Sequence, residues 1–516
     1  MNSLLRAERK MKSIMFKRYQ FNHTGQRAHC PRTVLLTAIM VATLVGCAAV
    51  GPDYVPVEPE PQEKWHSELQ GGLTADRPNP ETLAHWWTTL NDPELSSLEE
   101  RAVKGNLDLR EAQARIREAR ALRGISKANL FPTVDGGGTV TERRFSENSS
   151  TGDRNTLYAA GFDAGWELDI FGGVRRSVEA AEADLEATQE GLHDVLVSLL
   201  AEVALNYVEV LTFQARLAVT EANIKTLEKS YELNASLYQA GIIDELAVQE
   251  SLRLLETSRS QIPALETGLE AARNRLAVLL GEQPGKLHQE LAAKRLLPAV
   301  PTTVAVGIPA ETLRHRPDMR RAERFLAAQT ARIGVATADL YPKFRLFGTI
   351  GLESISTADF FQYSSRAWSF GPSFSWNIFD AGAIRQNIKV QTARQEQALI
   401  QYESAVLQAL EEVENVLVAY AKEQDRRDSL AKAEAAAERA TLLAQDQYEA
   451  GLVNFNNVLD TQRALLVLQD QLAQSEGTVT SNLVRLYKAL GGGWTSLQPA
   501  ADNSNLVAQD KEQAAR

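Results

Sequence analysis

The sequence contains very little cysteine and histidine, and it lacks the common motifs of catalytic sites. Its two cysteines, Cys30 and Cys47, lie in or beside the N-terminal leader, which leaves the mature chain without a disulfide framework or a cysteine-rich metal site. The seven histidines are scattered, and no nucleotide-binding loop, zinc-hydrolase helix or serine-hydrolase elbow is present. These absences disfavour an enzyme, and we expect neither a metal nor a dissociable cofactor.

Positive charge is also scarce once the leader is set aside. The whole chain has 55 Lys and Arg residues against 66 Asp and Glu residues, a formal net charge of -11. Residues 1–46 hold eight basic residues and one acidic residue, so the rest of the chain has 47 basic and 65 acidic residues, or a net charge of -18. Such a chain is a poor partner for nucleic acid, whereas an acidic conduit would favour cations.

Residues 1–46 have the order of a signal peptide for export, because basic residues precede an apolar run at 34–45. The run ends in Leu-Val-Gly-Cys47, which resembles the bacterial lipobox. We therefore expect Cys47 to be lipidated with diacylglycerol and palmitate; an ordinary signal with a chance cysteine is the alternative. Ala48 follows, which in such lipoproteins goes with sorting to the outer membrane.

Two segments alternate between apolar residues and small or polar residues with a period of two, which is typical of strands. They run over 158–170 and 368–378, and earlier partner strands are predicted over 133–145 and 343–353. A tilted strand crosses a bilayer in roughly 9 to 11 residues, so both alternating runs are long enough. Aromatic residues on the apolar face favour a lipid-facing wall around a wet lumen over the alternative, a soluble β-sandwich.

A very long helical segment follows each strand pair. Residues 175–238 contain no proline, and a helix of about 64 residues would be ~95 Å long, which no bilayer can accommodate. Two series of residues recur every seven positions, which predicts lateral packing as coiled coils. They are Leu192, Leu199, Asn206 and Phe213, and Leu196, Val203, Val210 and Leu217.

A glycine is expected to turn the chain back after each long helix. Gly241 precedes a returning helix at 246–280, in which Pro263 predicts a kink. The second half repeats the pattern with a helix at 382–448, a turn at Gly451 and a return at 458–490.

The two halves are related by an offset of 210 residues over most of their length, which predicts one architecture built twice. The predicted organisation has six parts. They are a signal peptide (1–46), a lipidated extended tether with an equatorial segment (47–107), repeat 1 (108–281), a linker (282–317), repeat 2 (318–491) and a disordered tail (492–516). Asp108 is predicted to be the N-cap of the first helix of repeat 1.

Acid and arginine side chains recur just past each predicted turn. Glu250 and Arg253 lie three residues apart on one helical face, and Asp460 and Arg463 repeat this spacing. Solvated intrahelical ion pairs are the alternative to a functional role. In an assembly with an axis of symmetry, copies of Asp460 at the axis would form a ring of like charges.

Motifs distributed from Cys47 to Trp494 resemble the TolC-like outer membrane factor family, most closely its OprM-like lipoprotein branch, the NodT family. They are VGPDYVP at 50–56, GWELDIFGGVRR at 165–176, RHRPDMRRAE at 314–323, YEAGLVN at 448–454 and ALGGGW at 489–494. The resemblance implies a mixed α and β membrane protein. It would be a homotrimer whose twelve-stranded transmembrane β-barrel, with four strands from each chain, continues into a periplasmic α-helical barrel of coiled coils.

The resemblance also implies partners and roles for the turns. A periplasmic adaptor (membrane fusion) protein and an inner-membrane pump of the RND type would dock at the periplasmic tips. The residues implied at the tips are Gly241, Gly451, Tyr238 and Tyr448, and those implied at the periplasmic gate are Asp460, Arg463, Glu250 and Arg253. Asn456 and Asn457 depart from the family, whose members often have an apolar residue there, so an apolar constricting ring is not expected.

The implied function is the outer-membrane exit duct of a tripartite efflux system that exports small molecules such as drugs. The protein would be lipid-anchored in the outer membrane and would extend into the periplasm. Two alternatives stay open: an outer-membrane channel for type I protein secretion, and a structural lipoprotein that spans the envelope.

Overall fold

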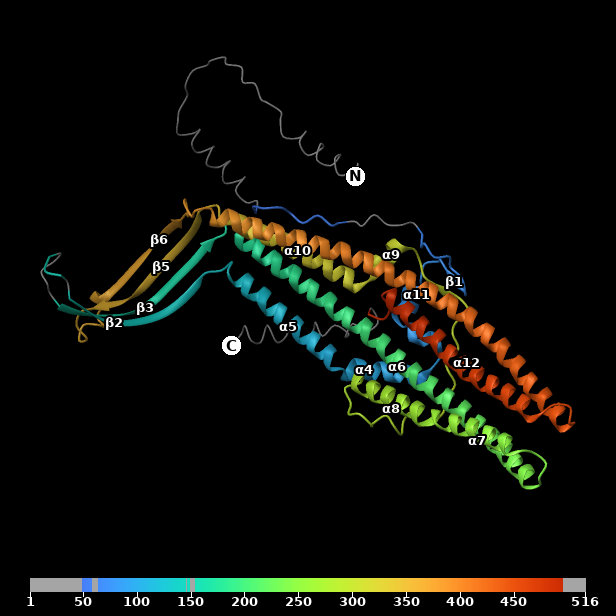
Figure 1. Cartoon of the computed structure of the whole chain (residues 1–516). Coiled ribbons are helices and arrows are strands. Elements are labelled where there is room, and N and C mark those ends of the chain that lie inside the picture. Colours follow the sequence, from blue (N-terminus) through green and yellow to red (C-terminus); the bar gives the residue numbers. More distant parts are fainter. Residues whose placement is uncertain (1–48, 58–63, 145, 149–153, 495–516) are drawn as a thin grey trace, which may run out of the picture. The chain divides into compact units, whose positions relative to one another are not determined.

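A computed structural model describes residues 49–57, 64–144, 146–148 and 154–494 (Figure 1). The predicted signal peptide, Cys47 and the tail beyond Trp494 lie outside the described residues. The longer elements are α4 (Pro93–Gly105), α5 (Leu107–Ala128), β2 (Thr133–Arg144), β3 (Arg154–Leu168), α6 (Gly173–Gln239), α7 (Glu245–Arg259), α8 (Gln261–Leu279), α10 (Pro317–Ala338), β5 (Lys343–Ser354), β6 (Arg366–Ser375), α11 (Ala383–Glu449) and α12 (Phe455–Ala489). The shorter ones are β1 (Leu73–Thr74), α3 (Pro80–Ala84), η1 (Trp86–Leu90), β4 (Val304–Ala305), α9 (Pro309–His315) and η2 (Tyr363–Ser365).

The four long strands form one antiparallel sheet in the order β2-β3-β5-β6. Its register places Phe162 of β3 beside Gly136 of β2 and Ile350 of β5, and Ile350 lies beside Trp368 of β6. The predicted alternation therefore extends across the whole sheet and gives it one apolar face. Most side chains on both faces are exposed in the described chain, so the sheet does not form the buried interior of a soluble sandwich.

Each long helix begins beside an aspartate that precedes its first turn. Asp169 accepts hydrogen bonds from the first backbone N–H groups of α6, and Asp380 does the same at the start of α11. Hydrogen bonds from the N–H groups of Ile384 and Gly382 hold the pKa of Asp380 below its usual range. Because these aspartates belong to the helix starts, β3 and β6 end before their predicted last residues.

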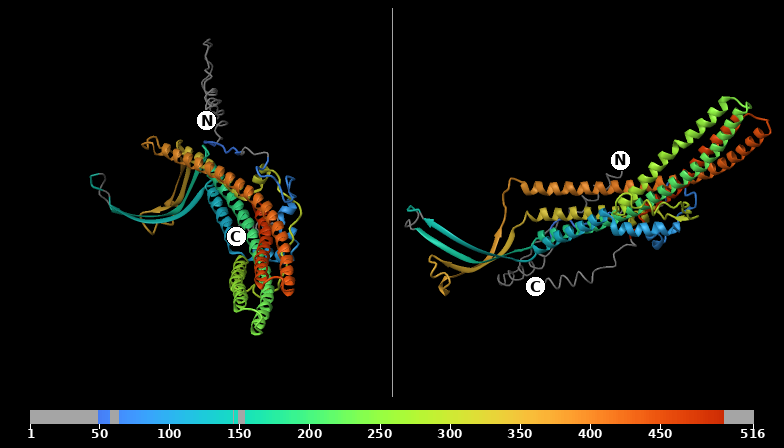
Figure 2. Two further views of the ribbon diagram at one scale, coloured as in Figure 1. Left: turned by 45° about the vertical axis from the view of Figure 1, so that its right-hand side comes forward. Right: turned by 90° about the horizontal axis from the view of Figure 1, so that it is seen from below.

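The helices lie side by side, with the sheet at one end and the α6–α7 and α11–α12 turns at the other (Figures 1 and 2). The predicted long helices are confirmed, since α6 and α11 each contain 67 residues, about 100 Å of helix. Leu196, Val203 and Val210 of one predicted seam are buried against neighbouring helices. The segment of α6 that is apolar enough to cross a membrane is 61% buried within the structure, so helix packing accounts for its composition.

The return helix of the first half is interrupted, whereas that of the second half is continuous. The break falls at Ser260, between α7 and α8, and Pro263 is the third residue of α8. A proline ring clashes with the carbonyl four residues earlier, here that of Arg259, so the helix must end there. Ala473 takes the equivalent place in α12, which runs unbroken from 455 to 489. The predicted kink is therefore confirmed as a helix break.

The N-terminal segment is extended as predicted, but it is bound to the helical body instead of hanging free. Asp53 forms an ion pair with the buried Arg176 at 2.6 Å, and the N–H groups of His66 and Ser67 donate to Glu414 at 2.6 and 3.0 Å. The two-residue strand β1 pairs in parallel with β4. The predicted tether is therefore extended, but side-chain and backbone contacts hold it against the helices.

The predicted N-cap Asp108 is wrong by two residues. Asn106 caps α5, because its side chain accepts a hydrogen bond from the N–H of Leu109 at 2.9 Å. The Asn106 amide also donates to the carbonyl of Leu279 at 2.9 Å, which ties the helix start to the end of α8. Asp108 lies in the first turn, where its negative charge interacts favourably with the positive end of the helix dipole and stabilises the helix.

Candidate functional site

The two helical turns have the same backbone conformation. Gly241 and Gly451 have φ angles of +72° and +73°, in the left-handed region that favours glycine. In each turn the glycine N–H bonds to a tyrosine carbonyl three residues back, Tyr238 or Tyr448, at 2.9 Å. The next N–H bonds five residues back at 2.9 Å, which is the pattern that ends a helix in a Schellman motif. The predicted turns at Gly241 and Gly451 are therefore confirmed.

A small hydrophobic cluster near the turns joins the first coil pair, α6 with α7, to the second coil pair, α11 with α12. It consists of Leu227, Leu254, Leu255, Ala444, Phe455, Val458 and Leu459. The predicted tip residue Tyr448 packs against it, edge-on to Phe455 at 5.1 Å between ring centres. Tyr238 is 45% exposed, so its ring is more accessible than that of Tyr448.

Only one of the two predicted acid–arginine pairs is formed. Asp460 and Arg463 approach to 3.5 Å on the exposed side of α12, with 71% and 47% of their side chains accessible. Within the described part of the chain, Glu250 and Arg253 make no ion pair within 4 Å. The structure therefore places an exposed charge pair one turn into α12, and in α7 it leaves the equivalent groups apart.

Sequence reasoning missed a layer of buried polar side chains between the coil pairs. Asn234 of α6 is fully buried without a hydrogen-bond partner for its amide among the described residues. Gln462 of α12 is also buried and donates to Ser230 of α6 at 3.3 Å. Asn234 continues the seven-residue series that contains Asn206, so extending that series would have found it.

An ion pair that sequence reasoning also missed joins α6 to α12 farther from the turns. The Arg216 guanidinium donates to both carboxylate oxygens of Asp470, at 2.7 and 3.0 Å. Both side chains are more than two-thirds buried, so the pair is better shielded from water than Asp460 and Arg463. Bidentate geometry makes it a specific connection between the first and second coil pairs.

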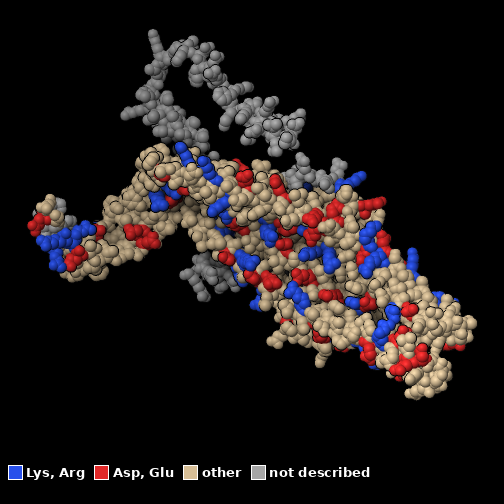
Figure 3. Space-filling view, viewed as in Figure 1, with Lys and Arg blue, Asp and Glu red and all other residues tan. Residues whose placement is uncertain are grey.

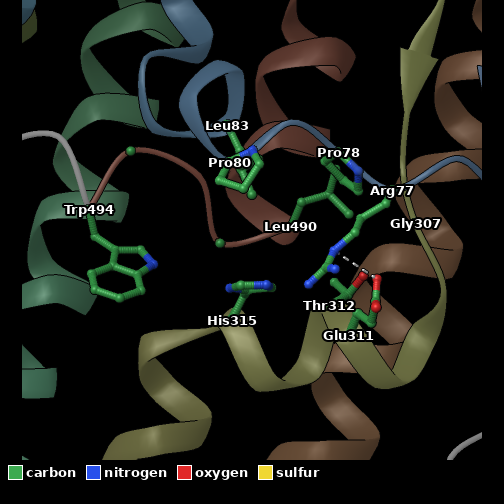
Figure 4. Close-up of a pocket in the computed structure, with 12 residues that line it drawn as sticks. Arg77, Pro78, Pro80, Leu83, Gly307, Glu311, Thr312, His315, Leu490 and Trp494 are labelled. Atoms are coloured by element: carbon green, nitrogen blue, oxygen red, sulfur yellow. Dashed lines mark ion pairs between the residues drawn. The ribbon is translucent and has the colours of Figure 1, made fainter.

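A small pocket lies where the N-terminal segment, α9 and the end of α12 meet (Figure 4). Its volume is about 90 Å³, its walls are mostly apolar, and an Arg77–Glu311 ion pair at 3.6 Å lies at one side. No group of three His, Cys, Asp or Glu side chains that could hold a metal occurs among the described residues.

Trp494 forms one wall of this pocket and corrects the predicted start of the disordered tail. Its ring lies between His193, at 4.8 Å, and the Arg320 guanidinium, at 5.0 Å. The N–H of Gly493 also donates to the carbonyl of Leu83 at 3.1 Å. Residues 492–494 are therefore packed against the helices. The composition of this segment does not predict this, because the packing depends on the contacts of Trp494 with His193 and Arg320.

Comparisons with known proteins decide the family. The family model for the outer membrane efflux protein matches residues 98–282 and 308–492, which is most of the described chain. The chain belongs to the outer membrane efflux protein family. Its function is that of an outer-membrane exit duct for efflux.

Relatives of this efflux protein match over nearly their whole length. Nodulation protein T of Rhizobium leguminosarum bv. trifolii is 32% identical over 89% of this chain and 97% of its own. The toluene efflux pump outer membrane protein TtgI of Pseudomonas putida is also 32% identical, over 88% of this chain and 97% of its own. The solved structure of the outer-membrane channel OprN matches with a TM-score of 0.81 and 36% identity, over 87% of this chain and all of that chain.

Proposed function

We propose that three copies of this chain form a passive duct that carries small molecules from the periplasm to the exterior. The observation that carries the proposal is the four-stranded sheet with one apolar face and an unpaired outer edge on each of β2 and β6. Lipid cannot satisfy the hydrogen bonds of open strand edges, so neighbouring copies must close them. Three copies give twelve strands and room for a lumen, whereas eight strands are normally filled by their own side chains.

The helical part of the duct would extend into the periplasm. Helices α6 and α11 are about three times as long as a bilayer is thick, and their buried seams are typical of coiled coils in water. Lipidation of Cys47 would anchor each chain at the outer membrane. The turns at Gly241 and Gly451, with Tyr238 and Tyr448 beside them, would contact a periplasmic adaptor that links the duct to an inner-membrane pump of the RND type.

The periplasmic end would be held closed by a balance of charge and packing. Copies of Asp460 near a three-fold axis repel one another, while Arg463 supplies compensating charge at 3.5 Å. The Arg216–Asp470 pair and the Ser230–Gln462 bond connect α12 to α6. An adaptor that moves the second coil pair outward would have to break these connections, which makes opening a two-state event.

Deleting the gene and restoring it on a plasmid tests this function directly. We expect drugs or dyes to accumulate in the deleted strain and to be exported again when the parent gene returns. Unchanged accumulation together with a weakened envelope would favour the structural lipoprotein. Loss of one secreted protein with normal dye export would favour the type I secretion channel.

A further inference from the structure

An arginine lies at the end of the apolar face of the sheet, on the side away from the helices. The register pairs Ile350 of β5 with Trp368 of β6 and, two residues farther along, Leu352 with Arg366. Side chains two residues apart on a strand share a face, so Arg366 lies on the same face as Trp368. Figure 3 shows that the strand region is mostly uncharged, with Lys and Arg side chains beside Asp and Glu side chains at its far end.

A hollow of about 1100 Å³ opens on the sheet beside this arginine. Small residues of β2 and β3, Gly136 and Ala160 among them, leave space between larger side chains from the same face. Those larger side chains are Phe162, Ile350, Leu352, Tyr363, Arg366 and Trp368. The hollow is therefore apolar along its length and cationic at one end.

Arg366 is held in place without an acidic partner. Its guanidinium carbon lies 4.3 Å from the centre of the Tyr363 ring, a cation–π contact. Among the described residues Arg366 makes no ion pair within 4 Å, whereas Arg345, on the opposite face, pairs with Glu167 at 3.1 Å. The charge of Arg366 is thus available to a ligand, and that of Arg345 is already compensated.

The loop that carries Tyr363 is ordered by its own hydrogen bonds. The buried Ser365 donates to the carbonyl of Asp359 at 2.6 Å, and the Gln362 amide donates to the Asp359 carboxylate at 2.7 Å. Tyr363 and Arg366 are therefore positioned before any ligand arrives, which lowers the entropic cost of binding.

We propose that this hollow binds an acyl chain of a phosphorylated lipid, and that Arg366 binds its phosphate. The site fits such a lipid because the apolar hollow and the uncompensated guanidinium lie end to end, as the tail and headgroup of a lipid do. This inference rests on the proposed function, in which the hairpin ends face the exterior. The ligand is then the lipid A of the outer leaflet, whose phosphates lie at the level of the hairpin ends.

Binding of defined lipids to the purified full-length protein in detergent tests this site, with native mass spectrometry as the measurement. Arg366→Gln should weaken binding of bisphosphorylated lipid A by about tenfold, since hydrogen bonds to charged groups are the stronger ones. It should leave the weaker binding of dephosphorylated lipid A unchanged. Ala160→Leu, which fills the hollow, should weaken the binding of both lipids.

Arg345→Gln is the matched control, because it removes an arginine from the opposite face of the same sheet. It should bind lipid A as the parent does. Parent-like lipid A binding by Arg366→Gln, or an equal loss in Arg345→Gln, would overturn the site. Tighter binding of phosphatidylglycerol than of lipid A would overturn the assignment to the outer leaflet.

Single-channel conductance of the same preparations separates this inference from the proposed function. If the parent protein conducts, and Arg366→Gln and Arg345→Gln bind lipid A equally well, then the lipid site is wrong but the proposed duct is not affected. If the parent protein forms no channel, the proposed duct fails, whatever the lipid result.

Discussion

The exposed pair of Asp460 and Arg463 would matter more in the proposed trimer than it does in a single chain. In the single chain the pair is exposed and contributes little, as surface pairs do. In a symmetric ring, two carboxylates about 6 Å apart would repel by roughly 0.7 to 3 kcal/mol with an effective dielectric of 80 to 20. In the proposed trimer, the balance between this repulsion and the compensating charge of Arg463 would decide how tightly the tip closes.

Single substitutions at this pair should each change a different property of the channel in planar bilayers. Arg463→Ala removes the compensating charge, so we expect a leakier closed state. Asp460→Ala removes the acidic ring, so we expect a lower preference for cations. Asp425→Ala, which removes one partner of an exposed Lys422–Asp425 pair with the same spacing, should behave as the parent. If both tip variants conduct as the parent does, Asp460 and Arg463 are solvated charges and the gate lies elsewhere.

Glu99 of α4 is a buried carboxyl group without a hydrogen-bond partner among the described residues. Burial raises its pKa well above the usual range. The folded chain therefore keeps a proton that the unfolded chain releases near pH 4, so the free energy of unfolding falls as the pH rises above that value. The loss is complete once the pH exceeds the folded-state pKa.

Glu99→Gln should remove this pH dependence, because an amide resembles the protonated acid at every pH. At pH 7.5 the variant should be more stable than the parent by at least about 1 kcal/mol, and the gap should close near pH 4. Thermal unfolding across this pH range is the measurement. Glu100→Gln, at an exposed neighbour that pairs with Lys104, should not change the profile. A constant gap at all pH values would mean that Glu99 is not protonated in the folded protein.

At the scale of an element, the interrupted α7–α8 and the continuous α12 show the effect of one proline. Pro263 lies in the first turn of α8, where its missing N–H has no intrahelical acceptor in any case. Ala473 lies in the interior of α12 and is buried. A proline should therefore destabilise the protein much more at position 473 than at the equivalent position 263.

Ala473→Pro should destabilise the protein by about 3 kcal/mol or more, since it removes an interior helix bond and adds a ring clash. Pro263→Ala should change the stability by less than about 1 kcal/mol, because the helix start tolerates either residue. Thermal unfolding of the two variants beside the parent provides the comparison. Equal effects at both positions would contradict the assignment of the break at Ser260 to Pro263.

At the scale of the whole molecule, the isolated chain exposes an apolar sheet face and two strand edges at once. Both features are unfavourable for a soluble monomer, and both are satisfied when copies close a barrel within lipid. The proposed trimer would therefore complete a hydrogen-bonding pattern that one chain leaves open.

Mass measurement of the detergent-solubilised protein should give three chains per particle. The native Pro372 is tolerated in β6 because the N–H that it lacks would face the open edge, so the N–H of Phe370, two residues earlier, also faces that edge. Phe370→Pro should remove this edge donor, leave the helices intact and lower the proportion of trimer. Gly124→Ala, in helix α5 and away from the sheet, serves as a control for general loss of stability. A stable monomer of the parent protein would contradict the strand-counting argument.

The strands, the two long helices and the glycine turns could be predicted from the sequence to within a few residues at their ends, because each depends on local periodicity or on the conformation of one residue. The sequence also indicated the interruption at Pro263, for the same reason. Contacts between residues far apart in the chain could not be predicted in this way, because they depend on how the helices pack. Arg216 and Asp470 are 254 positions apart, and nothing in either local pattern joins them. Trp494 likewise became part of the core because His193 and Arg320 lie on two other helices, and only folding brings the three side chains together.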